Sequence, residues 1–355
     1  LMFPQDFLPL INGTSLEIQL GEWVIRQALH YLQQWQAQSK PWHISINLSA
    51  YHLGSNGFLQ RLNEIIAEFP TVDLQYFQFE ILESHALDDL SLIVDVVRHC
   101  REEFNIKTVL DDFGTGYSSL SHIRTLPVSA VKIDQTFVRN MLADVDDCKI
   151  VEGVIALARS FDLEVIAEGV ESVRHGQILL SMGCELAQGY VIAKPMPAAH
   201  IADWQQQFTL PEDWLSYRDS RQHIKWTQLN LFCLYLQLSL ESVELRFEAE
   251  LDDVNLCPII SIKQSHCGVW LDRTENLQLI DMESLQILKE KYRSFHHLLT
   301  MTLKLYQAGK KQSGLQNLHS LRSRYQDIYE YIQSIMSAFQ PGEITASKSQ
   351  YATNH

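Results

Sequence analysis

The 355-residue chain lacks several features that define common classes of protein. Its six cysteines form no C-x-x-C pair and no dense cluster, which is typical of reduced thiols and argues against a disulfide scaffold. No run of residues approaches the roughly 18 consecutive apolar side chains that a membrane-spanning helix needs. The first residues also lack the basic, apolar and small-residue segments of a signal peptide. We therefore expect a cytoplasmic protein with no membrane segment in this chain.

Basic residues are scarce as well: 28 Lys and Arg stand against 43 Asp and Glu, for a formal net charge of −15. Proteins that coat DNA or RNA carry clustered Lys and Arg, so we expect no nucleic-acid partner. A ligand that contains phosphate would need bound cations or a local basic pocket. The length indicates two domains. The opening LMFPQDFLPL is typical of the middle of a domain, so we expect an excerpt from a longer protein.

The first part of the chain alternates short β-branched, apolar runs with longer stretches of helical periodicity. The short runs lie at 43–49, 77–83, 107–113, 130–134, 164–170 and 186–192. A strand followed by a helix at this repeat length predicts an α/β fold with a parallel sheet, either open or closed into a barrel. Only six such units are visible, so a closed eight-stranded barrel would lack its first two strands here.

Every predicted strand has a polar or charged residue at or near its carboxyl end. These residues are Asn47, Glu80, Asp111, Asp112, Lys132, Glu168 and Gln188. The carboxyl ends of the strands of a parallel barrel open on one face, so these side chains would converge. Any one acid could be an ordinary solvated loop residue, and Lys132 an exposed surface lysine, but six consecutive units favour a carboxylate-rich mouth. Hard oxygen ligands of this kind suit Mg²⁺ or Mn²⁺.

The adjacent aspartates Asp111 and Asp112 could bind two metal ions, with one carboxylate bridging both ions and the other binding the second ion only. Two such ions activate water and stabilise the attacking and leaving oxygens of a phosphodiester. Lys132 could orient the water or neutralise charge in the transition state. The stretch DFGTGYSS that begins at Asp112 is rich in glycine and hydroxyl groups, which suits a mobile loop that closes over a site.

Five motifs, in order, resemble the EAL family of bacterial cyclic-di-GMP phosphodiesterases across residues 1 to about 208. They are FEILES (79–84), DDFGTGYSSL (111–120), VKIDQTFV (131–138), VIAEGVES (165–172) and QGYVIAKPMP (188–197). The resemblance implies a TIM-like (β/α)8 barrel with one antiparallel strand, which hydrolyses cyclic di-GMP to linear pGpG in bacterial signal transduction. It also implies an upstream regulatory or diguanylate-cyclase-type domain in the parent protein.

The resemblance implies a role for each residue of the mouth. The ligands of the first metal would be Asn47, Glu80 and Asp111. The ligands of the second metal would be Asp111, Asp112 and Glu168. Lys132 would assist the nucleophilic water, and Gln188 would contact water at the metal or the substrate.

The resemblance also assigns residues that support the mouth. The loop after the aspartates begins with Phe113, Gly114, Thr115 and Gly116. Glu83 would brace this loop, and Glu171 would support Glu168. Each of these two glutamates could equally be an ordinary acid at the start of a helix, stabilised by the helix dipole.

Two departures from the family pattern bear on activity. The Glu-Ala-Leu motif, which supplies a further glutamate to the first metal, does not occur in the printed sequence, and we expect it upstream with an arginine that holds substrate phosphate. We therefore expect weak or no turnover by this piece alone. Leu82 stands where the family often has Thr, which is tolerable because Leu is no ligand.

Two other functions compete with hydrolysis. A catalytically inactive barrel could serve as a cyclic-di-GMP receptor or as a protein-interaction module. Inactive members of the family usually lose metal-binding acids, whereas the residues of the mouth are all present here, and this favours the enzyme. An unrelated sugar-binding barrel would leave DDFGTGYSSL unexplained.

Beyond residue 208 the pattern becomes helical and predicts an all-α bundle over 219–340, with an irregular stretch near 251–278. Residues 341–355 lack periodicity, and we expect a disordered tail. The segments 227–238 and 298–307 are apolar over wide faces, which is typical of a core or of a dimer interface. We expect a homodimer.

The bundle resembles, less specifically, the chemoreceptor-type zinc-binding helical domain. HIKW (223–226), SHCGVW (265–270) and FHHLLTMTLKLYQAG (295–309) carry this resemblance. His223 and His296 remain as possible ligands, but Ser265 and Tyr292 stand where the family has a cysteine and a histidine. Structural zinc sites use four N or S ligands, so we expect a degenerate domain without tight zinc binding.

Overall fold

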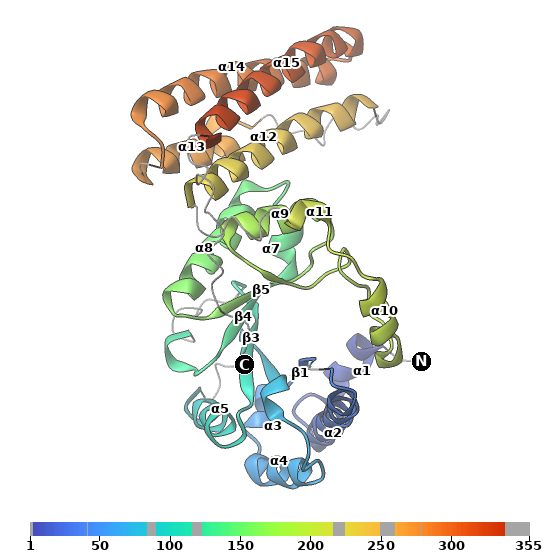
Figure 1. The fold of residues 1–355 in the computed structure, drawn as a ribbon. Coiled ribbons are helices and arrows are strands. Elements are labelled where there is room, and N and C mark those ends of the chain that lie inside the picture. The colour runs from blue at the N-terminus through green and yellow to red at the C-terminus, as the bar shows by residue number, and fades with distance from the viewer. Residues whose placement is uncertain are drawn as a thin grey trace. The chain divides into compact units, whose positions relative to one another are not determined.

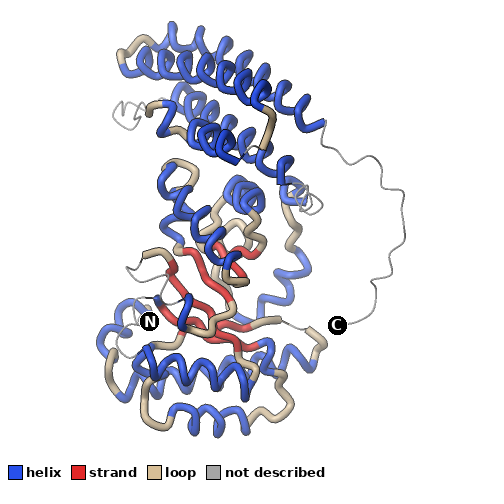
Figure 2. The backbone as a smooth tube through the Cα atoms, turned by 90° about the vertical axis from the view of Figure 1, so that its left-hand side faces the viewer, coloured by secondary structure: helices blue, strands red, loops and turns tan. Residues whose placement is uncertain are grey.

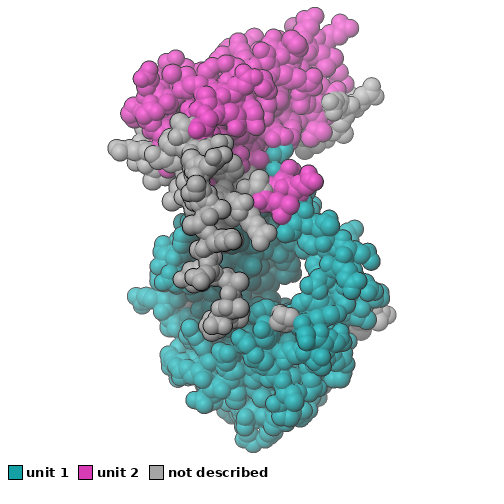
Figure 3. Space-filling model, viewed as in Figure 1, with its two compact units in different colours: residues 1–211 teal, residues 212–355 magenta. Residues whose placement is uncertain are grey.

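The computed structural model describes residues 3–40, 42–83, 90–115, 123–215, 224–248, 260–277 and 279–337. The chain forms two compact units, residues 1–211 (unit 1) and residues 212–355 (unit 2) (Figure 3). Among the described helices, none combines the length and the apolar character that a membrane crossing demands.

Unit 1 is built on a parallel sheet whose strands follow one another in chain order. The strands are β1 (Ile44–Asn47), β2 (Phe77–Leu82), β3 (Lys107–Phe113), β4 (Ala130–Ile133), β5 (Glu164–Ala167) and β6 (Leu186–Ala187). All five pairings between neighbours are parallel, so the antiparallel strand implied by the resemblance is not among these six. This six-stranded half-barrel confirms the prediction of a partial TIM-like barrel (Figure 1).

Helices separate the strands along the chain and lie around the sheet (Figure 2). They are α1 (Pro4–Ile11), α2 (Ser15–Ala37), α3 (Ala50–Leu53), α4 (Phe58–Ala67), α5 (Leu90–Phe104), α7 (Gln135–Asn140), α8 (Val145–Ser160), α9 (Val173–Met182) and α10 (Ile201–Gln207), with short 3-10 turns η1 (Leu74–Tyr76) and η3 (Ala198–His200). A parallel sheet needs such crossover helices, because each strand must return to the same end of the sheet.

The core of unit 1 lies between the sheet and these helices. Every residue of β4 is buried, as are Phe77 and Phe79 of β2, because a parallel sheet is covered on both faces. The rings of Phe77 and Phe79 pack edge to face with centroids 5.4 Å apart, and Phe58 of α4 packs on Phe79. Burial of each ring contributes roughly 1.5–3 kcal/mol, which holds the strand ends in a fixed frame.

Side-chain caps fix the points at which strands give way to helices. Asp134, directly after β4, accepts a hydrogen bond from the Thr136 amide at 2.8 Å and begins α7. Ser172 caps α9 in the same way, five residues after β5 ends. Such caps satisfy amides that have no partner within the helix and contribute about 1 kcal/mol each.

Unit 2 is helical. Its helices are α11 (Glu212–Leu215), α12 (Ile224–Glu248), α13 (His266–Leu277), α14 (Met282–Gln307) and α15 (Lys311–Ser337), with a 3-10 turn η6 (Ile262–Gln264). The helix α13 shows that the prediction of an irregular stretch near 251–278 is wrong for its C-terminal part. The physical reason is local. The Ser265 hydroxyl accepts a hydrogen bond from the Gly268 amide at 3.1 Å, and this cap starts a helix that helix propensity alone does not favour. The predicted tail, 341–355, lies outside the described residues.

The core of unit 2 is aromatic. Phe232 contacts the rings of Trp270 and Tyr292, with centroids 4.9 and 5.9 Å away. All six residues at 231–236 of α12 are buried, so this part of the helix offers no apolar face to solvent. The wide apolar character of 227–238 is therefore explained by core packing, and it gives no support to a dimer interface there.

Candidate metal centre

A β-bulge places the two adjacent aspartates on the same side of the sheet. In the pairing of β3 with β4, Leu110 lies opposite Val131 and Phe113 opposite Ile133, so Asp111 and Asp112 together face one residue, Lys132. Neighbouring residues of a regular strand point to opposite faces. The bulge removes this alternation, and Asp112 takes a left-handed conformation with φ of 54°. One extra residue in β3 thus brings two carboxylates to one site.

Glu168 completes a cluster of three carboxylates. Oxygens of Asp111, Asp112 and Glu168 lie within 4.8 Å of one another, and Glu168 follows the last residue of β5 directly. The Glu168 amide donates to the Ile133 carbonyl at 3.2 Å, which continues the β4–β5 pairing by one residue and fixes where the side chain begins. The predicted convergence of carboxyl strand ends is found for these three residues.

Lys132 lies at the centre of the acidic group. Its ammonium is 2.5 Å from Glu168, 2.9 Å from Glu80 and 3.1 Å from Asp111, and its side chain is only 5% exposed. Burial alone would lower the pKa of Lys132, but the hydrogen bond to Glu168 and the charge of Glu80 raise it above its usual value. Lys132 is therefore a permanently charged donor, and the interpretation of a surface lysine is wrong.

The carboxylates outnumber the cation that contacts them. Burial, and then the charge of Asp111, raise the pKa of Asp112 to about 6, and a hydrogen bond that protonated Asp112 donates to Asp134 adds to this shift. The pKa of Glu168 is also raised, because burial outweighs its ion pair with Lys132. These raised pKa values mean that the cluster holds more negative charge than its one cation compensates. An all-oxygen donor set with excess negative charge fits Mg²⁺ or Mn²⁺, so the residues present suit the predicted metal.

The remaining residues of the predicted mouth lie at the same edge of the sheet. Asn47 is the last residue of β1 and pairs in register with Glu80 of β2. Gln188 follows β6, and its amide donates to the Ala167 carbonyl at 2.8 Å. Glu80 joins the cluster through Lys132, whereas Asn47 is placed by strand register alone.

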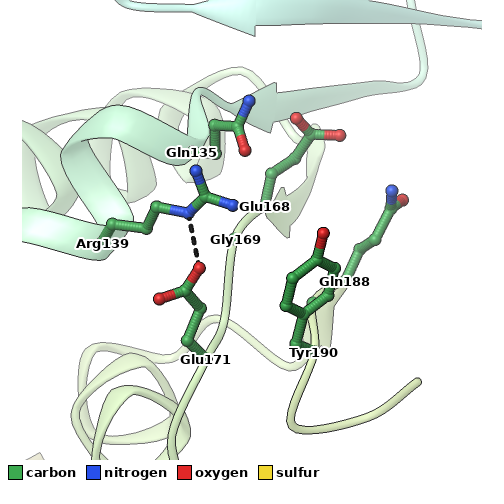
Figure 4. A pocket seen from close by; sticks show the side chains of 8 residues that line it. Gln135, Arg139, Glu168, Gly169, Glu171, Gln188 and Tyr190 are labelled. Atoms are coloured by element: carbon green, nitrogen blue, oxygen red, sulfur yellow. Dashed lines mark ion pairs between the residues drawn. The ribbon is translucent and has the colours of Figure 1, made fainter. Parts of the chain in front are cut away.

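A pocket of about 210 Å³ opens beside Glu168 (Figure 4). The side chains that line it are Gln135, Arg139, Glu168, Glu171, Gln188 and Tyr190, together with two glycines. Arg139 donates to Glu171 across the pocket at 2.8 Å, and the support of Glu168 by Glu171 stays a prediction. Gly189 is required here, because a Cβ would lie 2.2 Å from the Val170 carbonyl. Polar groups and an exposed tyrosine ring therefore adjoin the carboxylate cluster.

The loop after the aspartates is tied down from β2. The Gly114 amide donates to the buried Glu83 carboxylate at 3.1 Å, and Gly114 has a φ of 104° that favours glycine. The Thr115 hydroxyl donates to the Asp112 carbonyl at 2.9 Å, and Phe113 is buried. Gly116 lies outside the described residues. The contact of Glu83 is of the kind that the resemblance predicts, and its part in catalysis stays a prediction.

Several residues of the site were not identified from the sequence. Asp134 contacts Asp112 and caps α7, and the signal for it is that it ends the predicted strand 130–134, two residues after Lys132. Arg139 and Tyr190 carry no such signal, because one lies inside a helix and the other in a loop. Only the folded chain brings them to one pocket.

The predicted remnants of a zinc site lie in unit 2, and His223 falls outside the described residues. His296 is buried, and its Nε2 has no hydrogen-bond partner among the described residues. The hydroxyl of Tyr292 donates to Ser265 Oγ at 2.9 Å, and that oxygen in turn donates to the Ile262 carbonyl at 2.6 Å. The two residues that replace the expected cysteine and histidine thus bond to each other and fix the start of α13.

Comparison with known proteins agrees with the geometry of unit 1. The profile of the EAL domain matches residues 1–195. The chain is 35% identical over 201 residues to the cyclic di-GMP phosphodiesterase PA2567 of Pseudomonas aeruginosa, covering 57% of this chain and 34% of that protein. It is 31% identical over 207 residues to the cyclic di-GMP phosphodiesterase PdeR of Escherichia coli, covering 58% and 31%. The chain thus spans about a third of the length of these curated relatives.

A solved structure gives the same result. The phosphodiesterase PaMucR in complex with c-di-GMP superposes with a TM-score of 0.53 at 33% identity, covering 56% of this chain and 81% of that one. The six parallel strands and the acidic cluster fall within the region that the EAL profile covers, and so do the matched motifs apart from the last two residues of QGYVIAKPMP. The chain belongs to the EAL domain family.

Proposed function

We propose that this protein hydrolyses cyclic di-GMP to linear pGpG with two divalent metal ions, Mg²⁺ or Mn²⁺. The observation that carries the proposal is the bulge-built cluster of Asp111, Asp112 and Glu168 around Lys132, with oxygens within 4.8 Å of one another. The relatives named as cyclic di-GMP phosphodiesterases, and the relative solved with c-di-GMP, support the choice of substrate.

The residues divide the work as follows. Asp111 would be shared by both ions, with Asn47 and Glu80 on the first and Asp112 and Glu168 on the second. Bound metal ions supply an activated water and stabilise charge on the phosphodiester oxygens.

Lys132 would act as a fixed positive donor, since its raised pKa keeps it protonated throughout the neutral range. It would orient the attacking water and offset charge on the phosphate. Water adds to phosphorus, the bond to one ribose 3′ oxygen breaks, and that oxygen takes up a proton, which leaves a linear dinucleotide with a 5′ phosphate. Gln188 and the pocket beside Glu168 would contact the substrate.

The test is a hydrolysis assay with Asp112→Asn, in the presence of Mg²⁺ or Mn²⁺. Asn keeps the left-handed backbone accessible but removes a charged ligand, so we expect product formation to fall by at least about 100-fold. Asp146→Asn is the matched control, because the side chain of Asp146 is 85% exposed in α8 and should have no effect.

Turnover by the printed chain should be low, since it contains no Glu-Ala-Leu motif, so a longer protein that carries this motif is assayed beside it. Equal product from the unaltered protein and Asp112→Asn would overturn the two-metal assignment. Tight binding of cyclic di-GMP with no product in the longer protein would identify a receptor instead.

A further inference from the structure

The segment 168–172 carries Glu168 at one end and Ser172 at the other, and it packs closely against α7. A Cβ on Gly169 would lie 2.8 Å from Gln135 Cβ, so the backbone of this segment touches the first turn of the helix. The Val170 amide donates to the Gln188 carbonyl at 3.1 Å. The position of the Glu168 carboxylate therefore depends on what holds this segment against α7.

His175, in the first turn of α9, joins the two elements. Its Nε2 lies 3.3 Å from the Arg139 carbonyl in α7, and its Nδ1 lies 2.8 Å from the Ser172 hydroxyl. A carbonyl only accepts, so Nε2 carries the proton and donates, and Nδ1 accepts from Ser172. The imidazole is 6% exposed and neutral, in keeping with a pKa that burial lowers.

Together these contacts close a ring. Arg139 is held through its carbonyl by His175 and through its guanidinium by Glu171, at 2.8 Å. Glu171 precedes Ser172, which in turn bonds to His175. The segment after Glu168 is thus fastened to α7 at two points, one of them buried.

We infer that His175 is a positioning residue for Glu168: its two directed hydrogen bonds hold segment 168–172 against α7 and thereby fix a carboxylate of the metal cluster. The inference rests on the proposed function for its consequence in metal binding, but the positioning itself can be measured without metal. A hydrogen-bonded group behind a metal ligand commonly changes metal affinity by 10- to 100-fold when removed.

The first experiment measures hydrogen exchange in the metal-free chain, at the amides of Glu168 and Val170. His175→Leu keeps the volume and removes both hydrogen bonds, and we expect roughly tenfold faster exchange, the effect of losing about one buried hydrogen bond. His175→Gln can still donate to the Arg139 carbonyl and accept from Ser172, so it should stay within about threefold of the unaltered chain. A merely space-filling role would abolish this difference between the two variants, since Leu fills the site as well as Gln.

A matched control comes from the same unit. His52 is 1% exposed, and neither ring nitrogen has a partner among the described residues, so His52→Leu should leave exchange at Glu168 and Val170 unchanged. If His175→Leu does not fold, the hydrogen bond between Ser172 and His175 is tested from its other end: Ser172→Ala removes the hydroxyl, and Ser172→Thr keeps it. Unchanged exchange in His175→Leu, or equal acceleration in His175→Gln, would overturn the inference.

The second experiment is a Mn²⁺ titration followed by electron paramagnetic resonance. His175→Leu should bind Mn²⁺ about tenfold more weakly than the unaltered chain, and His175→Gln should bind nearly as well as it. If the unaltered chain shows no binding that depends on Asp112, the proposed function fails while the exchange data still decide the role of His175. If it binds and His175→Leu binds equally well, the positioning role fails while the metal site stands.

Discussion

Replacing Lys132 by Met tests whether the acidic cluster depends on one internal cation. The side chains of Lys132, Glu80 and Asp111 are at most 10% exposed, and the ammonium lies within 3.1 Å of three carboxylates. Removing one member of a buried ion pair leaves an uncompensated charge and typically costs about 3–5 kcal/mol. We expect Lys132→Met to lower the free energy of unfolding of the metal-free chain by that amount at pH 7.

The pH dependence of the free energy of unfolding of Lys132→Met has a definite expected sign. The pKa of Asp112 is already raised to about 6, and that of Glu168 is raised too, so the charged forms are disfavoured in the folded chain. As pH falls from 7 to 5, these groups take up protons more readily when folded than when unfolded, and the variant should regain stability. Lys132 itself has a raised pKa, so its contribution in the unaltered chain is present below pH 10.5 and constant across this window.

The assay is unfolding in urea, monitored through hydrogen exchange in peptides from β3, β4 and β5. These peptides report the unfolding of unit 1 separately from that of unit 2. Lys149→Met is the control: Lys149 bonds to Asp146 at 2.9 Å, but both side chains are exposed, so its loss should cost under about 1 kcal/mol. Adding Mn²⁺ at 100 times its dissociation constant should restore about 2.7 kcal/mol to Lys132→Met. An unfolding free energy equal to that of the unaltered chain, with no gain on acidification, would refute the reasoning.

Three further predictions concern single positions of unit 1. Asp112→Asn should raise the melting temperature of the metal-free chain at pH 7, since it removes a disfavoured charge; a lower melting temperature would contradict the excess of negative charge. Burial lowers the pKa of His52, so the contribution of His52 to the free energy of unfolding is fully present above pH 6.5 and is lost as the pH falls below that value. His52→Leu should reduce this acid-induced loss of stability in urea melts at a series of pH values, and an unchanged slope would count against the prediction. Gly153 lies in the interior of α8 with open space for a Cβ, so Gly153→Ala should stabilise the fold by about 0.5–1 kcal/mol, whereas Gly189→Ala should destabilise it by more than that. Thermal melts should therefore show a higher melting temperature for Gly153→Ala and a lower one for Gly189→Ala.

Much of unit 1 could be predicted from the sequence because strand order and strand ends follow from local pattern. The apolar runs fixed six strands within a few residues, and the polar residue at each carboxyl end indicated which side chains meet at the mouth. Parallel topology then brings Glu80 and Glu168 to one edge although they are far apart in the chain.

The bulge at Asp111 and Asp112 could not be predicted in the same way. Both aspartates are expected at the mouth, but in a regular strand neighbours point to opposite faces, so the strand pattern gives no account of how both reach one site. The extra residue arises from the pairing of β3 with β4, which is a tertiary property. The same holds for Arg139 and Glu171, whose ion pair depends on the packing of segment 168–172 against α7.

In unit 2 the error has a different origin. The stretch that contains α13 has weak helical periodicity. The start of α13 depends on one hydroxyl, that of Ser265, which forms hydrogen bonds with Gly268, Ile262 and Tyr292. A Cβ at Gly268 would lie 1.7 Å from the Ile262 carbonyl, so the glycine is needed for this close turn. Periodicity does not register contacts of this kind.

The demand for a cation at the mouth follows from charge and burial, independently of any family resemblance. The carboxylates of Glu80, Asp111 and Glu168 contact one ammonium, that of Lys132. Asp112 adjoins Asp111 and Glu168 and contacts Asp134, and the raised pKa values of Asp112 and Glu168 indicate that Lys132 does not compensate all of these acids. A chain that keeps such a cluster half-buried sacrifices stability in the absence of bound cations. Divalent ions would relieve the repulsion between the acids and leave Lys132 free to face the substrate. The feature that would make unit 1 less stable without metal is therefore the same feature on which the proposed phosphodiester hydrolysis depends.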